Sequence, residues 1–167
     1  MFDEINGLPI HPLAVHVAVV LVPLAGLLGV LFAIPHTRRW VRVPLVIVAI
    51  GAVPAVFVAK ESGKSLSAVL GLDSSGRADS RVAAIVREHA ERADLLFILV
   101  IGFAVLAVLA VAVSAKFDAL PAVVPVVVSV LLVLGAVALA FQTVRVGESG
   151  ARAVWNPTGE QSFVPGD

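Results

Sequence analysis

Three of the four histidines in this 167-residue chain lie where the polypeptide enters long apolar stretches. His11 and His16 open the first of these stretches, and His89 precedes the third. Imidazole is a common ligand for metals and haem iron, and a histidine inside an apolar membrane bundle is costly to bury. Histidines gathered at one end of an aliphatic bundle therefore favour a metal or haem site.

The segment around His89 predicts an amphipathic helix that starts near Ser80 and runs into the third apolar stretch. His89 is the polar member of a stripe whose apolar residues recur every three or four positions: Val82, Ile85, Val86, Ala93 and Leu96. His11 and His16 are separated by about 7.5 Å along a helix and by roughly 140° around it. Because they diverge, the spacing favours His16 and His89 as the facing pair. His11 is then a second ligand, a partner for a haem propionate or a helix cap.

Two histidines that face each other in a helical bundle suit axial ligation of haem b, which is the favoured cofactor. Zinc or copper would need further ligands, for which the chain offers His11 and the carboxylates Glu61, Glu88 and Glu148. A third interpretation has no cofactor and uses the histidines as structural hydrogen-bonding residues. The matching functions are an electron carrier of cytochrome b type, a zinc- or copper-binding membrane protein, and a non-redox accessory subunit.

Composition places the chain in a membrane. It is 59% hydrophobic and 14% charged, with a mean hydropathy of +1.03, values that exclude an ordinary soluble domain. Lysine plus arginine equals aspartate plus glutamate at 12 each, and without a basic run the chain is not a nucleic-acid binder. The absence of cysteine excludes disulfides, thiolate ligands and covalent c-type haem. No nucleophile elbow, P-loop or dinucleotide fingerprint is present, so the pattern favours a carrier or accessory subunit over an independent enzyme.

Four apolar stretches are long enough to cross a bilayer, near residues 12–34, 41–59, 95–115 and 120–142. In lipid they must be helices, because an open strand would leave backbone groups unpaired. We therefore expect an all-α, integral membrane four-helix bundle as a single domain, with the third helix extended on the outer side. An outer loop at 60–94 and an irregular outer tail at 143–167 complete the prediction. Small residues at close-packing spacing leave a homo-oligomer open.

The charges of the loops predict an orientation. Two short turns and their flanks hold an excess of basic residues: Arg38, Arg39, Arg42 and Lys116 against Asp118. The positive-inside rule puts these turns in the cytoplasm and both termini outside. The three clustered histidines then lie in the outer half of the bundle. A redox partner protein would bind on that side, whereas His36 lies alone at the cytoplasmic end.

Two motifs are similar to those of a known bacterial membrane family. The segment Gly7-Leu8-Pro9-Ile10-His11-Pro12-Leu13-Ala14-Val15-His16 and the segment Arg145-Val146-Gly147-Glu148-Ser149-Gly150-Ala151 resemble the family called domain of unknown function 2231. The resemblance implies four spans in the bacterial cytoplasmic membrane. Relatives joined to Rieske or c-type cytochrome domains imply a redox membrane anchor. Carried onto this chain, the resemblance points to His11, His16 and His89. Some relatives have histidine where this chain has Glu148.

Overall fold

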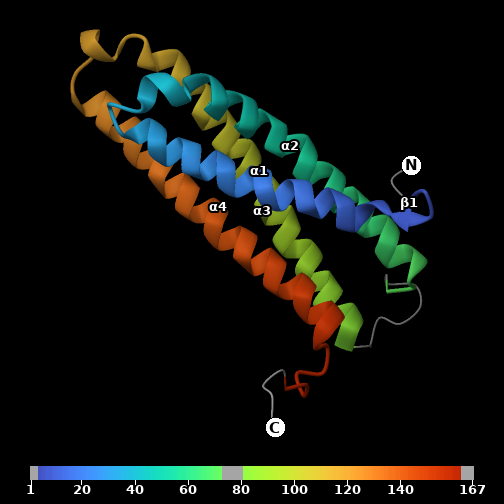
Figure 1. The fold of residues 1–167 in the computed structure, drawn as a ribbon. Helices are drawn as coiled ribbons and strands as arrows, with labels where there is room; N and C mark the ends of the chain where they lie inside the picture. Colours follow the sequence, from blue (N-terminus) through green and yellow to red (C-terminus); the bar gives the residue numbers. More distant parts are fainter. Residues whose placement is uncertain (1–3, 73–80, 163–167) are drawn as a thin grey trace.

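The computed structural model describes residues 4–72 and 81–162, and four long helices dominate it (Figure 1). The helices are α1 (Ile10–Ala33), α2 (Arg38–Val69), α3 (Arg81–Ser114) and α4 (Val123–Trp155). A minimal hairpin, β1 (Glu4–Ile5) and β2 (Leu8–Pro9), precedes α1, and a short 3-10 turn, η1 (Phe117–Ala119), lies between α3 and α4. Each of the four helices is long and apolar enough to span a membrane. The predicted all-α membrane bundle is confirmed.

The bundle consists of two antiparallel hairpins, α1–α2 and α3–α4, packed side by side (Figure 1). The main contacts of α1 are with α2 and α4, and those of α3 are also with α2 and α4. Hence α1 and α3 lie diagonally opposite each other. The starts of α1 and α3 and the ends of α2 and α4 share one end of the bundle, here called the histidine end.

Small residues allow the helices to approach closely in the core. The ring of Phe103, on α3, lies between glycines of α1 and α4. A Cβ atom at Gly29 would lie 2.7 Å from Phe103 Cζ, and one at Gly135 would lie 2.8 Å from Phe103 Cδ2. Only glycine therefore admits the phenyl ring at these two positions. Such close packing is the main source of helix association in lipid, where burial of apolar surface contributes little.

Arg38 joins the two short turns at the opposite end of the bundle. Its Nε donates to the Phe32 carbonyl at 3.0 Å, and an Nη donates to the Ala33 carbonyl at 3.3 Å. These contacts satisfy carbonyls that the end of α1 leaves without helical partners. The guanidinium also lies 4.9 Å from the centroid of the Phe117 ring, beside the second turn. Arg38 thus fastens one hairpin to the other.

The helices extend beyond the expected spans at the histidine end. The prediction of an irregular tail from residue 143 was wrong as far as Trp155, because α4 continues to that residue. Likewise α2 continues to Val69, so the loop expected at 60–94 is helical over its first ten residues. The predicted extended third helix is confirmed from Arg81 onward, while its expected start at Ser80 lies outside the described residues.

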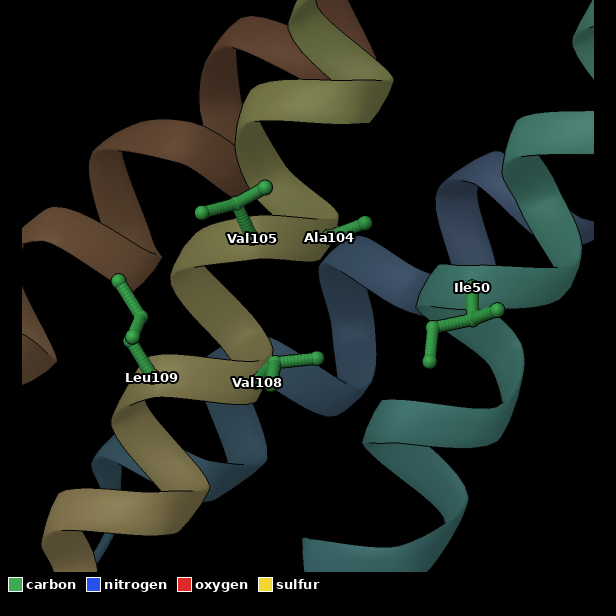
Figure 2. Close-up of a pocket in the computed structure, with 5 residues that line it drawn as sticks. All are labelled: Ile50, Ala104, Val105, Val108 and Leu109. Carbon is green, nitrogen blue, oxygen red and sulfur yellow. The ribbon is translucent and has the colours of Figure 1, made fainter.

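The outer surface of the bundle carries shallow aliphatic grooves. One of roughly 240 Å³ lies between α2 and α3 and is lined by Ile50, Ala104, Val105, Val108 and Leu109 (Figure 2). Its lining has no side chain that could ligate a metal or transfer a proton. The groove is suited to lipid acyl chains, and chemistry must be sought at the histidine end.

Candidate functional site

His11 and His89 meet at the histidine end of the bundle. Their ring centroids are 6.3 Å apart and their planes are inclined by 89°, an edge-to-face arrangement. His11 is in the first turn of α1 and His89 is in the third turn of α3, and both are half-buried. Because α1 and α3 are diagonal partners, this contact crosses the interior of the bundle.

His11 is held by the neighbouring helix of its own hairpin. Its Nδ1 lies 2.8 Å from the Ala59 carbonyl oxygen on α2. A carbonyl only accepts, so Nδ1 must carry the hydrogen, and Nε2 of the neutral ring keeps its lone pair. One turn further along α2, a Cβ atom at Gly63 would lie 3.0 Å from His11 Cε1. The ring therefore lies directly against the α2 backbone at a position where other residues carry a side chain.

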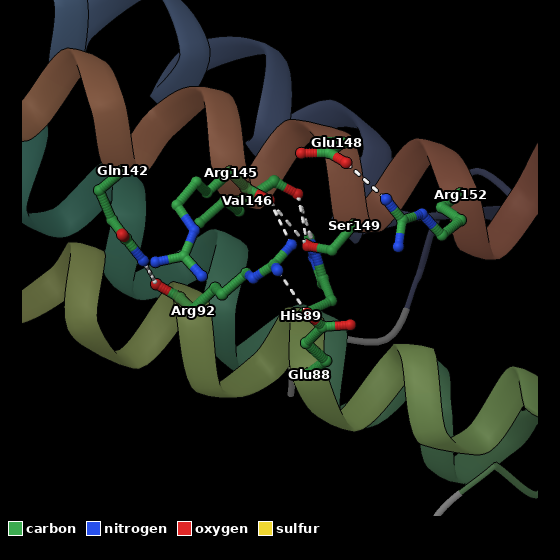
Figure 3. A network of polar contacts seen from close by, with 9 residues as sticks. All are labelled: Glu88, His89, Arg92, Gln142, Arg145, Val146, Glu148, Ser149 and Arg152. Atoms are coloured by element: carbon green, nitrogen blue, oxygen red, sulfur yellow. Dashed lines mark hydrogen bonds and ion pairs between the residues drawn. The ribbon is translucent and has the colours of Figure 1, made fainter.

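His89 is held in the same way by α4 (Figure 3). Its Nδ1 lies 3.0 Å from the Val146 carbonyl oxygen and 3.2 Å from Ser149 Oγ. The Ser149 hydroxyl donates to carbonyls of its own helix, so its oxygen can accept from His89. A Cβ atom at Gly150 would lie 3.1 Å from His89 Cε1. His89 therefore has the same tautomer as His11, with the hydrogen on Nδ1.

The second ring nitrogen of each histidine is available to a ligand. Across residues 4–72 and 81–162, Nε2 of His11 and Nε2 of His89 make no hydrogen bond. A histidine that ligates a metal commonly donates its other N–H to a backbone carbonyl or carboxylate, which fixes the tautomer and the ring orientation. Both imidazoles have this arrangement.

The separation of the rings is that of an ordinary aromatic contact. Ring pairs in an edge-to-face arrangement have centroids about 4.5–7 Å apart, and the observed 6.3 Å lies in that range. The two rings are therefore direct neighbours across the interior of the bundle.

His16 does not belong to this pair. It lies on the exposed face of α1, and its Nδ1 contacts the Pro12 carbonyl of its own helix. The expected pairing of His16 with His89 is therefore replaced by that of His11 with His89. The angular divergence of His11 and His16 was predicted correctly, but the member that faces the interior is the other one. His36 is exposed at the far end of the bundle.

The candidate carboxylates are each engaged with a base on their own helix. Glu61 pairs with Lys64 at 2.8 Å, Glu88 pairs with Arg92, and Glu148 pairs with Arg152. In the part of the chain that the structure describes, no three residues among histidine, cysteine, aspartate and glutamate are grouped closely enough to hold a metal ion. Among the described residues, the two imidazoles therefore lie together without a third such side chain.

Polar contacts around His89 align α3 with α4 (Figure 3). Arg92 donates to the Arg145 carbonyl at 3.1 Å, and the buried Gln142 donates to the Arg92 carbonyl at 2.8 Å. On the other side of α3, Lys60 of α2 pairs with Asp94 at 2.8 Å. These contacts fix α3 relative to both of its neighbours just inside the histidine pair, so the position of His89 is determined from two directions.

Sequence reasoning missed the residues that hold the imidazoles. They are Ala59 and Gly63 on α2 and Val146, Ser149 and Gly150 on α4. A signal was present, because the tripeptide Glu-Ser-Gly occurs at 61–63 and again at 148–150. Its recurrence near the ends of the two returning helices marks both contact points.

Together these features define a four-helix membrane protein with paired imidazoles at one end of the bundle. The chain belongs to the family of predicted membrane proteins called DUF2231, whose family model matches residues 7–160. The resemblance seen in the motifs is thereby confirmed. No curated protein and no solved structure matches the sequence significantly.

Proposed function

We propose that this protein binds haem b between His11 and His89 and carries electrons as a small membrane cytochrome. The observation that supports the proposal most directly is the adjacent pair of imidazoles from two helices, each with Nδ1–H bonded to a backbone carbonyl. Haem iron bound in this way would supply one-electron redox chemistry. The residues of the chain would supply two neutral nitrogen ligands, and the backbone carbonyls bonded to their Nδ1–H groups would help tune the potential.

The number of protein donors favours haem iron over a bare metal ion. Zinc in proteins is usually tetrahedral, and three or four of its ligands come from side chains. The described residues offer two imidazoles and no grouped third donor. In haem the porphyrin supplies four nitrogens, so only two axial ligands are required from the protein. A bis-imidazole site satisfies that requirement completely.

Optical spectroscopy of single-histidine variants tests the proposal. Wild-type protein, expressed with haem supply and purified in detergent, should show a Soret band and sharp α and β bands after reduction. His11→Ala and His89→Ala should lose these bands. His16→Ala is the matched control, because it removes an imidazole from the same end of the bundle but from the exposed face, and it should retain them. Monodispersity and thermal unfolding verify that each variant is folded.

Two results would refute the haem site, and a third would move it. A colourless wild-type protein after haem supply would do so, as would stoichiometric haem in both His11→Ala and His89→Ala. Loss of haem in His16→Ala with retention in His11→Ala would restore the pairing expected from sequence. The variant His89→Gly supplies a further check, because imidazole added to the solution should restore its haem spectrum.

The alternative to haem binding is that the two histidines only join neighbouring helices, and one observation favours it. Each Nδ1–H already bridges two helices, His11 to α2 and His89 to α4, so each imidazole stabilises its own hairpin without any cofactor. A folded, haem-free wild type that loses thermal stability in His11→Ala and His89→Ala would establish this accessory-subunit interpretation.

The proposal includes a location in the bacterial cytoplasmic membrane with the histidine end on the outer side. The support is the basic excess around the two short turns, where Arg38 and Arg39 are the first residues of α2 and Lys116 precedes η1. On that orientation, a redox partner would meet the haem from the outer side.

A further inference from the structure

The two hairpins place most of their buried residues at corresponding positions. A shift of 78 positions carries His11 onto His89. The same shift carries all six buried residues of α1 onto buried residues of α3: Ala18, Val22, Ala25, Gly26, Gly29 and Phe32 onto Leu96, Val100, Phe103, Ala104, Ala107 and Ala110. Since the buried positions coincide, α1 and α3 present equivalent faces to the core.

The returning helices correspond in the same way, with a shift of 87 positions. Four of the six buried residues of α2 coincide with buried residues of α4: Leu45, Ala49, Ala52 and Ser62 with Leu132, Ala136, Leu139 and Ser149. The shift also carries Ala59 onto Val146 and Gly63 onto Gly150. The two carbonyls that accept from the histidines are thus at equivalent positions, and so are the two glycines that lie against the rings. One histidine with its carbonyl and glycine is here called a half-site.

We propose that Gly63 and Gly150 are positioning residues that make one site from two equivalent half-sites. Each glycine lets an imidazole lie against the facing helix and donate Nδ1–H to the carbonyl one turn earlier. This contact holds both Nε2 atoms in the unprotonated form that a shared axial ligation requires. The inference deepens the proposed haem function and rests on it for the identity of the ligand, but the positioning itself is a property of the chain alone.

The distances show why alanine would disturb the arrangement. At Gly150 a Cβ atom would lie 3.1 Å from His89 Cε1 and 3.3 Å from Nδ1, closer than ordinary carbon contacts of about 3.5–4.0 Å. At Gly63 the corresponding distances to His11 are 3.0 Å and 3.1 Å. The ring must move away by a few tenths of an ångström, and its hydrogen bond to the carbonyl must lengthen or bend.

The chain offers a matched control on each helix. A Cβ atom at Gly147, three residues before Gly150 on α4, would meet nothing within 4 Å, and the same holds for Gly51 on α2. Alanine at either control position adds a methyl group and removes a helical glycine, as the test variants do. Any effect of Gly63→Ala or Gly150→Ala beyond that of the controls therefore reports contact with an imidazole.

Nitrogen-15 NMR of haem-free protein labelled at histidine decides the proposal. The chemical shifts of ring nitrogens identify which nitrogen carries the hydrogen. In the wild type, His11 and His89 should both show Nδ1–H and unprotonated Nε2. Gly63→Ala should change the His11 signals more than those of His89, Gly150→Ala should change the His89 signals more than those of His11, and Gly147→Ala and Gly51→Ala should leave both unchanged. Identical spectra for test and control variants, or wild-type signals from the opposite tautomer, would overturn it.

A second readout separates this proposal from the haem proposal. If the wild type binds haem, Gly63→Ala and Gly150→Ala should each weaken haem retention about tenfold, whereas the two control variants should match the wild type. A wild type that takes up no haem refutes the proposed function but leaves the NMR result to decide the positioning. Should Gly150→Ala fail to fold, Ser149→Ala removes the second acceptor of His89 without added volume. It should perturb the His89 signals and spare those of His11, and an unchanged His89 signal would count against the half-site.

Discussion

Replacing Gly29 with alanine should destabilise the whole bundle through a single ring. The added Cβ atom would lie 2.7 Å from Phe103 Cζ, whereas relaxed carbon contacts are about 3.5–4.0 Å, so the ring must move by roughly 1 Å. That movement is obstructed, because a Cβ atom at Gly135 on the other side would lie only 2.8 Å from the same ring. Overpacking of this kind costs about 1–3 kcal/mol. We expect Gly29→Ala to lower the free energy of unfolding by that amount.

Thermal or SDS-induced unfolding in detergent, followed by circular dichroism, measures the change. Gly102→Ala is the control, because a Cβ atom there would meet nothing within 4 Å, and it should be neutral or stabilising by up to about 1 kcal/mol. Adding Phe103→Leu to Gly29→Ala should restore part of the loss, since a smaller side chain relieves the overlap. If Gly29→Ala is as stable as Gly102→Ala, the ring is not confined as described and the reasoning fails.

Three further predictions concern the ends of the bundle and the haem. Lys60→Ala should lower the free energy of unfolding by less than about 1 kcal/mol, and salt should reduce the loss, because Lys60 joins α2 to the half-exposed Asp94 of α3. Lys64→Ala breaks only a pair within α2 and should lower it by less. The chain has no cysteine, so single variants His36→Cys and Thr158→Cys can be probed with an impermeant maleimide on intact cells. Only Thr158→Cys should react, and the reverse result would invert the proposed orientation. Carbon monoxide should leave the spectrum of the reduced haem protein unchanged, because histidines take both axial positions; a shifted Soret band would contradict that ligation.

Hydropathy predicted the helices well and their ends poorly. The apolar stretches required helices, because no other secondary structure satisfies the backbone in lipid. The end of α4 was missed because Gly147 and Gly150 resemble helix terminators in the sequence. A helical glycine costs only about 1 kcal/mol, and at Gly150 the missing side chain accommodates the His89 ring. The glycine that suggested an irregular tail is part of the interface between two helices.

The three histidines share one end of the bundle as predicted, but the two that lie together are His11 and His89, whereas the expected facing pair was His16 and His89. Position along the chain determines depth, and depth alone does not decide which face of α1 is turned inward. His11 lies seven residues before the buried Ala18, two full turns on the same face, whereas His16 lies on the exposed face. Assigning the inward face requires knowledge of the contacts with α2, which only the assembled bundle provides.

The repeat of the two hairpins also has a consequence for how such a site could originate and diverge. One hairpin paired with a second copy of itself would generate both imidazoles by rotational symmetry, as homodimers do. Joining two such hairpins in one chain would release them from being identical. The two hairpins of this chain differ close to the histidines, because the charged residues Glu88 and Arg92 of α3 correspond to the uncharged Ile10 and Ala14 of α1. Arg92 of α3 thus has no charged counterpart at the equivalent position of α1, and the surroundings of His11 and His89 differ in charge.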